Sequence, residues 1–155
     1  MKIEIIEYDH RFKKDIPILF TNTIHKTCNK DYTQAQLDAW ASPNIDFKIW
    51  EEKVAKSKPY LAIIQNKLVG FVEFYEDYID CFYIHHQYQG MGVGKSLMEH
   101  VLAIAKNNNI SKIKVDVSIT AKPFFEKFGF KQVKMNHIKR CDEELINFSM
   151  QLDNK

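Results

Sequence analysis

Apolar residues follow two spacings along the chain, and the changes between these spacings divide it into elements. Apolar positions three and four residues apart indicate helices, whereas alternating or short continuous apolar runs indicate strands. Helical spacing covers 11–27, 34–41, 47–56, 93–107 and 121–128. Strand-like runs cover 2–8, 59–65, 68–76, 79–84, 112–117, 130–139 and 144–152.

The resulting order is β-α-α-βββ-α-β-α-ββ, in which the second α stands for two short helices. Asn66 and Lys67 separate two strand runs by two residues, the length of a tight hairpin, and residues 140–143 separate the last two strands. The three strands before the long helix should therefore form an antiparallel meander. This order predicts an α/β fold, a mixed and mostly antiparallel sheet flanked by helices, with residues 1–155 as a single domain.

Short polar residues precede several of the helical runs. Asp9, Thr33, Asp46 and Thr120 stand at these positions, where a side-chain oxygen can accept a hydrogen bond from a free N–H of the first turn. Pro17 falls inside the first run, which predicts a kink or a restart of that helix.

Composition and charge narrow the classes of function. The chain has 155 residues, is 45% apolar and carries a formal net charge of +2, which gives no electrostatic argument for a nucleic-acid or membrane partner. No apolar run reaches the length of a membrane span. Cys28, Cys81 and Cys141 are far apart and odd in number, so we expect free thiols and a cytoplasmic protein.

Residues 79–98 carry the clearest candidate chemistry. A short apolar strand is followed by Gly90, Gly92 and Gly94 and then by a helix, so free N–H groups and the positive end of the helix dipole meet at a flexible turn. Such a turn is suited to a phosphate or pyrophosphate. A Walker A loop would need glycine at Gln89, and the dinucleotide fingerprint would need a small residue at Lys95, so both are excluded.

Two motifs resemble the GCN5-related N-acetyltransferase (GNAT) superfamily. Gln89-x-x-Gly92-x-Gly94 resembles the pyrophosphate-binding signature of that family. The stretch from Ala121 to Phe130 is similar to the family's helix ending in Tyr-Glu-Lys-x-Gly-Phe, and one helix and one strand lie between the two motifs, as in the family. Residues 31–41, 118–125 and 145–150 look like an uncharacterised bacterial branch of it.

The resemblance implies that acetyl-CoA (coenzyme A) is the cofactor. Its pyrophosphate would be bound by the backbone N–H groups of the glycine loop, its pantetheine arm would pair with residues 82–84 as an added strand, and the N–H of Ile84 would face the thioester oxygen. The expected cofactor-binding residues are Phe82, Tyr83, Ile84, His85, His86, Gln89, Gly90, Met91, Gly92, Val93, Gly94, Lys95, Ser96, Ser118 and Phe125.

Acetyl transfer to an amine needs a base, and family members often place one four or six residues before the position of Ile84. Those positions hold Asp80 and Tyr78, and Asp80 is the first candidate because it is a charge in an apolar strand. Glu73 is the second candidate. Strand alternation puts 78, 80, 82 and 84 on one face, which leaves Cys81 on the opposite face, in the core.

His85 and His86 lack a third ligand, so no metal site is expected.

The chain departs from the family pattern at two positions. Phe125 replaces the tyrosine that protonates the leaving thiolate in many relatives, and Ser118 stands where an asparagine often contacts the cofactor. Either the thiolate leaves unassisted, or another hydroxyl substitutes, from Tyr78, Tyr32 or Ser118.

The resemblance leaves the acceptor open. Asp31, Tyr32 and Trp40 are candidate substrate-binding residues, and the aromatic residues between 32 and 50 are interpreted either as helix packing or as a lid. An acidic acceptor pocket could form from Asp31, Glu73, Glu76, Asp77 and Asp80. The first hypothesis is an N-acetyltransferase acting by direct transfer on the primary amine of a small molecule or peptide, as a monomer or homodimer. The alternatives are a protein lysine or N-terminal acetyltransferase and a non-catalytic acyl-CoA-binding module.

Overall fold

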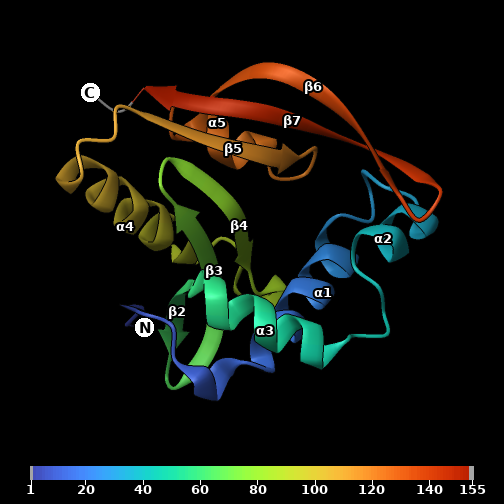
Figure 1. Ribbon diagram of the computed structural model, residues 1–155, viewed down its shortest axis with the longest axis horizontal. Helices are drawn as coiled ribbons and strands as arrows, with labels where there is room; N and C mark the ends of the chain where they lie inside the picture. The colour runs from blue at the N-terminus through green and yellow to red at the C-terminus, as the bar shows by residue number, and fades with distance from the viewer. Residues whose placement is uncertain (1, 154–155) are drawn as a thin grey trace.

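Seven strands form one mixed sheet in the computed structural model, which describes residues 2–153 (Figure 1). The strand order is β1-β2-β3-β4-β5-β7-β6, and every neighbouring pair is antiparallel except β4 and β5. The predicted fold class is therefore confirmed. The strands are β1 (Glu4–Ile6), β2 (Tyr60–Ile64), β3 (Lys67–Tyr75), β4 (Tyr78–Ile84), β5 (Lys112–Ser118), β6 (Lys131–Arg140) and β7 (Glu143–Asp153).

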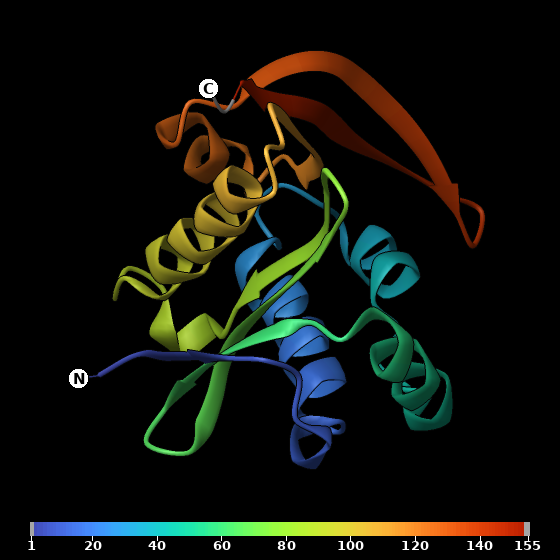
Figure 2. The ribbon, with the colours of Figure 1, turned by 60° about the vertical axis from the view of Figure 1, so that its left-hand side comes forward.

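Helices cover both faces of the sheet, and the sheet separates the hydrophobic core into two clusters (Figures 1 and 2). Phe71 of β3 packs with α1 and α3 on one face, whereas its neighbour Val72 packs with α4 and α5 on the other. No helix among residues 2–153 combines the length and apolarity needed to cross a membrane. The helices are α1 (Asp15–Thr27), α2 (Gln34–Trp40), α3 (Phe47–Ser57), α4 (Val93–Asn107) and α5 (Lys122–Lys127), with 3-10 turns at His10–Phe12 and His86–Tyr88.

Several helix starts differ from the sequence prediction. The first α-helix begins at Asp15 rather than at residue 11, because Asp9 caps the separate 3-10 turn by accepting from the N–H of Arg11 at 3.0 Å. Pro17 falls in the first turn of α1, where its missing N–H has no intrahelical partner to lose, so of the predicted kink or restart the structure shows the restart. Thr33 and Asp46 cap α2 and α3 as predicted.

Two smaller predictions are also corrected. Thr120 does not cap α5; Ser118 Oγ accepts from the N–H of Ala121 at 3.0 Å, and Thr120 donates instead to Asp31 Oδ2 at 2.7 Å. The first hairpin turns one residue early, at Gln65 and Asn66, whose positive φ values of 48° and 64° give the twist that two-residue hairpins favour.

Strands β4 and β5 separate soon after they meet. Their parallel ladder joins only Tyr78 with Lys114 and Ile79 with Val115. Beyond these pairs β4 stays with β3 as far as Ile84, whereas β5 stays with β7 as far as Ser118. The separation leaves two strand edges facing each other inside the sheet (Figure 1), and their peptide groups are available to a bound extended group.

A bulge in β4 changes which residues share a face. Glu73 pairs with Cys81 and Phe74 pairs with Ile79, so Asp80 is the extra residue of the bulged strand. The carboxylate of Asp80 consequently lies within 4.8 Å of the ligand atoms of both Glu73 and Cys81. The prediction that Asp80 and Cys81 lie on opposite faces is wrong, because a one-residue insertion reverses the alternation beyond it.

Tyr32 ties the helical N-terminal half to the C-terminal strands across the gap. Its buried hydroxyl donates to the carbonyl of Ile146 in β7 at 2.6 Å and accepts from the N–H of Ile119 at 3.0 Å. Its ring packs edge-on against Trp40 at 5.3 Å between centroids.

The link made by the Tyr32 hydroxyl should contribute to the stability of the fold. Replacing Tyr32 with phenylalanine leaves a buried carbonyl and a buried N–H without partners, so we expect a loss of about 1–3 kcal/mol in the free energy of unfolding. Urea unfolding measures it. Tyr75→Phe is the matched control, because Tyr75 is 72% exposed and should unfold like the wild type. Equal midpoints for Tyr32→Phe and wild type would contradict the structural role.

Candidate active site

Two cavities meet where β4 and β5 separate. The larger has a volume of about 200 Å³ and the smaller about 160 Å³. The two cavities share one wall. Two residues of this wall come from β4, and the others come from the segment that runs from the end of β5 into α5. The shared residues are Phe82, Tyr83, Ser118, Ala121 and Phe125. A molecule bound in one cavity can therefore touch a molecule bound in the other.

The smaller cavity is lined by apolar and uncharged side chains. Phe82 packs against Phe124 and Phe125 with centroid distances of 5.3 and 5.5 Å, and Phe125 is fully enclosed by this packing. Thr23, Thr27 and Cys28 from α1 and its end form the opposite wall. This lining suits an uncharged thioester arm better than a free ion.

The glycine loop has the shape predicted for an anion site. Gly92 adopts φ 88° as the residue before α4, a left-handed conformation that costs a residue with a Cβ about 1–2 kcal/mol. Gly94 is required for another reason, because a Cβ there would lie 2.8 Å from Phe124 Cε1. The helix α4 begins directly after this turn, and the N–H groups of its first turn have no partner within the helix.

The side chain of Gln89 has a structural role in this loop. Its Nε2 donates to the carbonyl of Ile84 at 2.8 Å, and Thr23 Oγ1 donates to the same carbonyl at 3.0 Å. Both bonds hold the end of β4 in place. His85 accepts from the N–H of Gln87 at 3.0 Å and stacks on His86, and neither histidine lines either cavity. Their contact with a cofactor stays a prediction.

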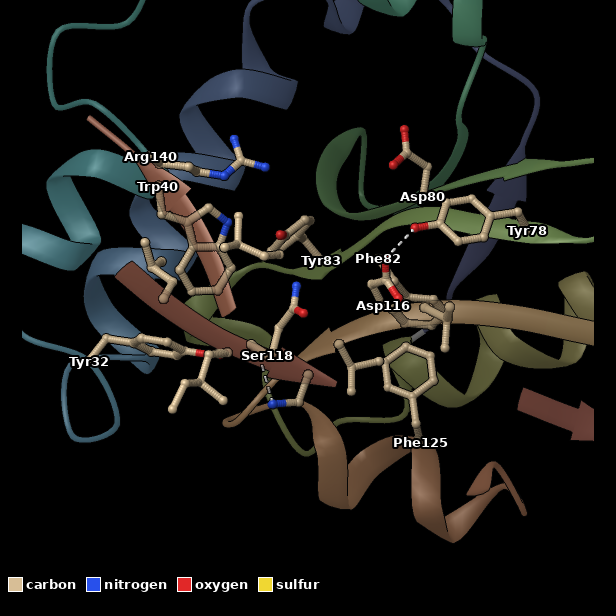
Figure 3. A pocket seen from close by; sticks show the side chains of 17 residues that line it. Tyr32, Trp40, Tyr78, Asp80, Phe82, Tyr83, Asp116, Ser118, Phe125 and Arg140 are labelled. Carbon is tan, nitrogen blue, oxygen red and sulfur yellow. Dashed lines mark hydrogen bonds between the residues drawn. The ribbon is translucent and has the colours of Figure 1, made fainter. Parts of the chain in front are cut away.

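The larger cavity carries charged groups from three strands (Figure 3). Asp80 comes from β4, Asp116 from β5 and Arg140 from the end of β6. Asp116 accepts hydrogen bonds from Tyr78 at 3.2 Å and from Ser149 at 2.6 Å. Burial and the adjacent Asp116 raise the pKa of Tyr78, so its hydroxyl is a committed donor rather than a base.

Glu73 lies beneath the cavity rather than in it. Its side chain is 4% exposed, and its Oε1 lies 3.5 Å from Lys53 Nζ, which also contacts Cys81 Sγ at 3.7 Å and the Trp50 ring at 4.7 Å. Burial alone would lower the pKa of Lys53, but the charges of Cys81, Glu73 and Asp80 outweigh it and raise that pKa. Three ligand atoms close enough for a metal occur here, but the Lys53 ammonium already supplies the compensating cation.

Tyr83 is the titratable side chain common to both cavities. Its ring lies against Phe20 and Phe71 at 4.9 and 5.8 Å. Burial raises the pKa of its hydroxyl well above the ordinary value. A hydrogen bond with Trp40 and the charge of Arg140 lower this pKa, but their effect is smaller than that of burial. At neutral pH this hydroxyl is protonated and can donate a hydrogen bond.

The predicted acidic acceptor pocket is wrong, since of its five residues only Asp80 lines the larger cavity. Asp31 is bound by Thr120, Glu73 by Lys53, and Asp77 lies 3.5 Å from Lys114. Tyr32 and Trp40 do line the cavity, although the hydroxyl of Tyr32 is used by the backbone.

Asp116 and Arg140 line the larger cavity although no pattern in the sequence singles them out. Asp116 alternates with apolar residues in β5 as any exposed strand residue would, and Arg140 stands in a basic stretch at a hairpin, so no local pattern distinguished them. Both enter the site through the pairing of β5, β7 and β6.

Comparison with known proteins places this geometry in a family. Residues 28–152 match the family model described as the acetyltransferase (GNAT) domain. The chain is 34% identical to an uncharacterized N-acetyltransferase of Escherichia coli strain K12, YafP, over 96% of this chain and 94% of that protein.

Solved structures share the fold. A GCN5-related N-acetyltransferase from Rhodopseudomonas palustris aligns with a TM-score of 0.92 and 26% identity over 99% of this chain and 96% of that one. The PaiA N-acetyltransferase of Thermoplasma acidophilum, solved with coenzyme A, aligns with a TM-score of 0.77 and 17% identity over 99% of both chains. Together with the glycine loop at α4 and the separated strands β4 and β5, these matches show that the chain belongs to the GNAT family of acetyltransferases.

Proposed function

We propose that this acetyltransferase uses acetyl-CoA to acetylate the primary amine of a small molecule by direct transfer. The observation that carries the proposal is the pair of cavities that meet at the separated strands, one uncharged and one charged. The donor's thioester supplies an activated acetyl group, and the residues of the chain hold it beside the amine. The small volume of the charged cavity, about 200 Å³, favours a small acceptor over a protein side chain on an extended peptide.

The cofactor fit is supported by the glycine loop and by the apolar cavity beside it. Backbone N–H groups at the start of α4 suit the pyrophosphate, because several charge-assisted hydrogen bonds to one anion reinforce one another. The free edge of β4 from Asp80 to Ile84 suits an extended amide-containing arm.

Direct transfer is favoured because no activated nucleophile lines the cavities among the described residues. Cys28 lines the smaller cavity, but burial raises the pKa of its thiol, and its neighbours Thr27 and Thr120 are not bases. Burial raises the pKa of Cys81 well above its ordinary value, and Cys81 lines neither cavity. The acetyl group therefore passes from sulfur to nitrogen without an enzyme-bound intermediate.

Asp80 is the proposed base. It is exposed in the larger cavity and accepts the proton that the amine loses, directly or through one water, while Glu73 stays paired with Lys53 below. Because the C–S bond breaks as the C–N bond forms, negative charge develops on the leaving sulfur. Tyr83 donates a hydrogen bond to this sulfur and keeps its own proton, and solvent protonates the released thiolate.

The base assignment is tested with Asp80→Asn. We expect kcat/KM to fall about 100- to 10,000-fold, because the amide cannot accept the proton. The assay follows thiol release from acetyl-CoA with polyamines, amino acids, aminoglycosides and short peptides. Asp77→Asn is the matched control, since Asp77 is paired with Lys114 outside both cavities. Unchanged turnover in Asp80→Asn would remove Asp80 as the base.

The role of Tyr83 is tested with Tyr83→Phe, which keeps the ring and removes the hydroxyl. A hydrogen bond to a developing charge is lost, so kcat should fall about 10- to 100-fold with little change in the KM for acetyl-CoA. Tyr32→Phe provides the comparison, because it should lower stability more than kcat. A kcat for Tyr83→Phe equal to that of the wild type would exclude the proposed donor.

The cofactor loop is tested with Gly92→Ala. The left-handed conformation is strained once a Cβ is present, so the loop should relax and the Kd for coenzyme A should rise about 5- to 30-fold. Titration calorimetry measures the Kd. Gly129→Ala introduces the same strain at φ 94° away from the loop, and it should lower the melting temperature without changing the Kd. Equal Kd values for Gly92→Ala and wild type would argue against pyrophosphate binding here.

A further inference from the structure

Opposite charges face the same small cavity from separate walls. Arg140 lines the cavity on the side of Trp40 and Tyr83, whereas Asp80 and Asp116 lie on the strands β4 and β5 (Figure 3). Asp116 already accepts two hydrogen bonds, from Tyr78 and Ser149. The side chain of Arg140, by contrast, makes no hydrogen bond or salt bridge with any residue in 2–153. The cavity therefore holds a cation whose donors are free for a ligand.

The position of Arg140 is set by long-range contacts. It is the last residue of β6, directly before the tight turn at Cys141 and Asp142, whose φ values are 48° and 67°. The hairpin tip is held on α2, because Gln36 Nε2 donates to the carbonyl of Glu144 at 2.8 Å. Farther along β7, the hydroxyl of Tyr32 donates to the carbonyl of Ile146 at 2.6 Å. Lys131, Lys134 and Lys139 on the same strand do not line the cavity, so Arg140 alone of these basic residues faces the acceptor side.

The size of the cavity limits the acceptor. Its volume is about 200 Å³. This is below the range of typical drug-sized ligand pockets. The aromatic walls from Tyr32, Trp40 and Tyr83 suit a short, partly apolar body between two charged ends.

We propose, on the basis of the function proposed above, that the acceptor is a small amine that also carries a carboxylate, namely a free amino acid. The guanidinium of Arg140 binds the carboxylate through two parallel N–H···O bonds. The amine end is placed toward Asp80: its ammonium form first releases one proton to solvent, and Asp80 takes the second proton as the nitrogen attacks. An amine without the carboxylate leaves Arg140 unpaired, so a peptide N-terminus or a lysine side chain is a poorer acceptor.

Matched pairs of acceptors test this inference. Each free L-amino acid is compared with its own carboxamide, which has the same side chain and amine but no negative charge. In the wild type we expect kcat/KM for the preferred acid to exceed that for its amide about 10- to 100-fold, since a charged hydrogen-bonded pair is lost. Arg140→Gln should bring this ratio close to one. Lys139→Gln, which removes a charge one residue away and outside the cavity, should keep the wild-type ratio.

A binding measurement separates this inference from the proposed function. Calorimetric titration of the same acids and amides into the protein saturated with coenzyme A should show the same preference, and Arg140→Gln should abolish it. Selective binding without turnover would overturn the proposed catalysis and support the acceptor assignment. Turnover or binding that is equal for acids and amides, or absent for every acid, or a preference that survives in Arg140→Gln, would overturn the inference.

Discussion

The site depends on the early separation of β4 and β5. Their ladder ends after Ile79 and Val115, so each strand keeps one partner and presents one free edge to the gap. A continuous ladder would satisfy those peptide groups and close the sheet. Because the ladder ends there, a gap remains between β4 and β5, and both cavities lie along this gap. The two cavities share lining residues at this gap.

The bulge at Asp80 adds a second constraint. It places the carboxylate of Asp80 in the larger cavity and close to the carboxylate of Glu73, which is buried. A buried carboxylate without a counterion is costly, and Lys53 offsets this cost from α3. Glu73 is thereby paired with Lys53 inside the fold, which leaves Asp80 as the exposed carboxylate of the two.

The two halves of the site have different origins in the chain. The half around the glycine loop is mostly local, because β4, the glycine loop and the start of α4 follow one another between residues 78 and 96. The half around the larger cavity is assembled from distant segments, as the hydrogen bonds from Tyr32 to Ile146 and from Gln36 to Glu144 show. Changes in the β6–β7 hairpin can therefore reshape the larger cavity without changing any residue of the glycine loop.

The sequence by itself determined the order of elements, the sheet class and the glycine loop, because hydrophobic periodicity and glycine spacing are local properties of the chain. It also predicted Asp80 and Phe125 for the site, and both line the larger cavity. Only the tertiary structure decided what lies beside them. The bulge reversed the strand alternation at Asp80, and long-range strand pairing brought Asp116 and Arg140 to the cavity. No local pattern records such contacts, because register and hairpin position depend on the packing of the whole sheet.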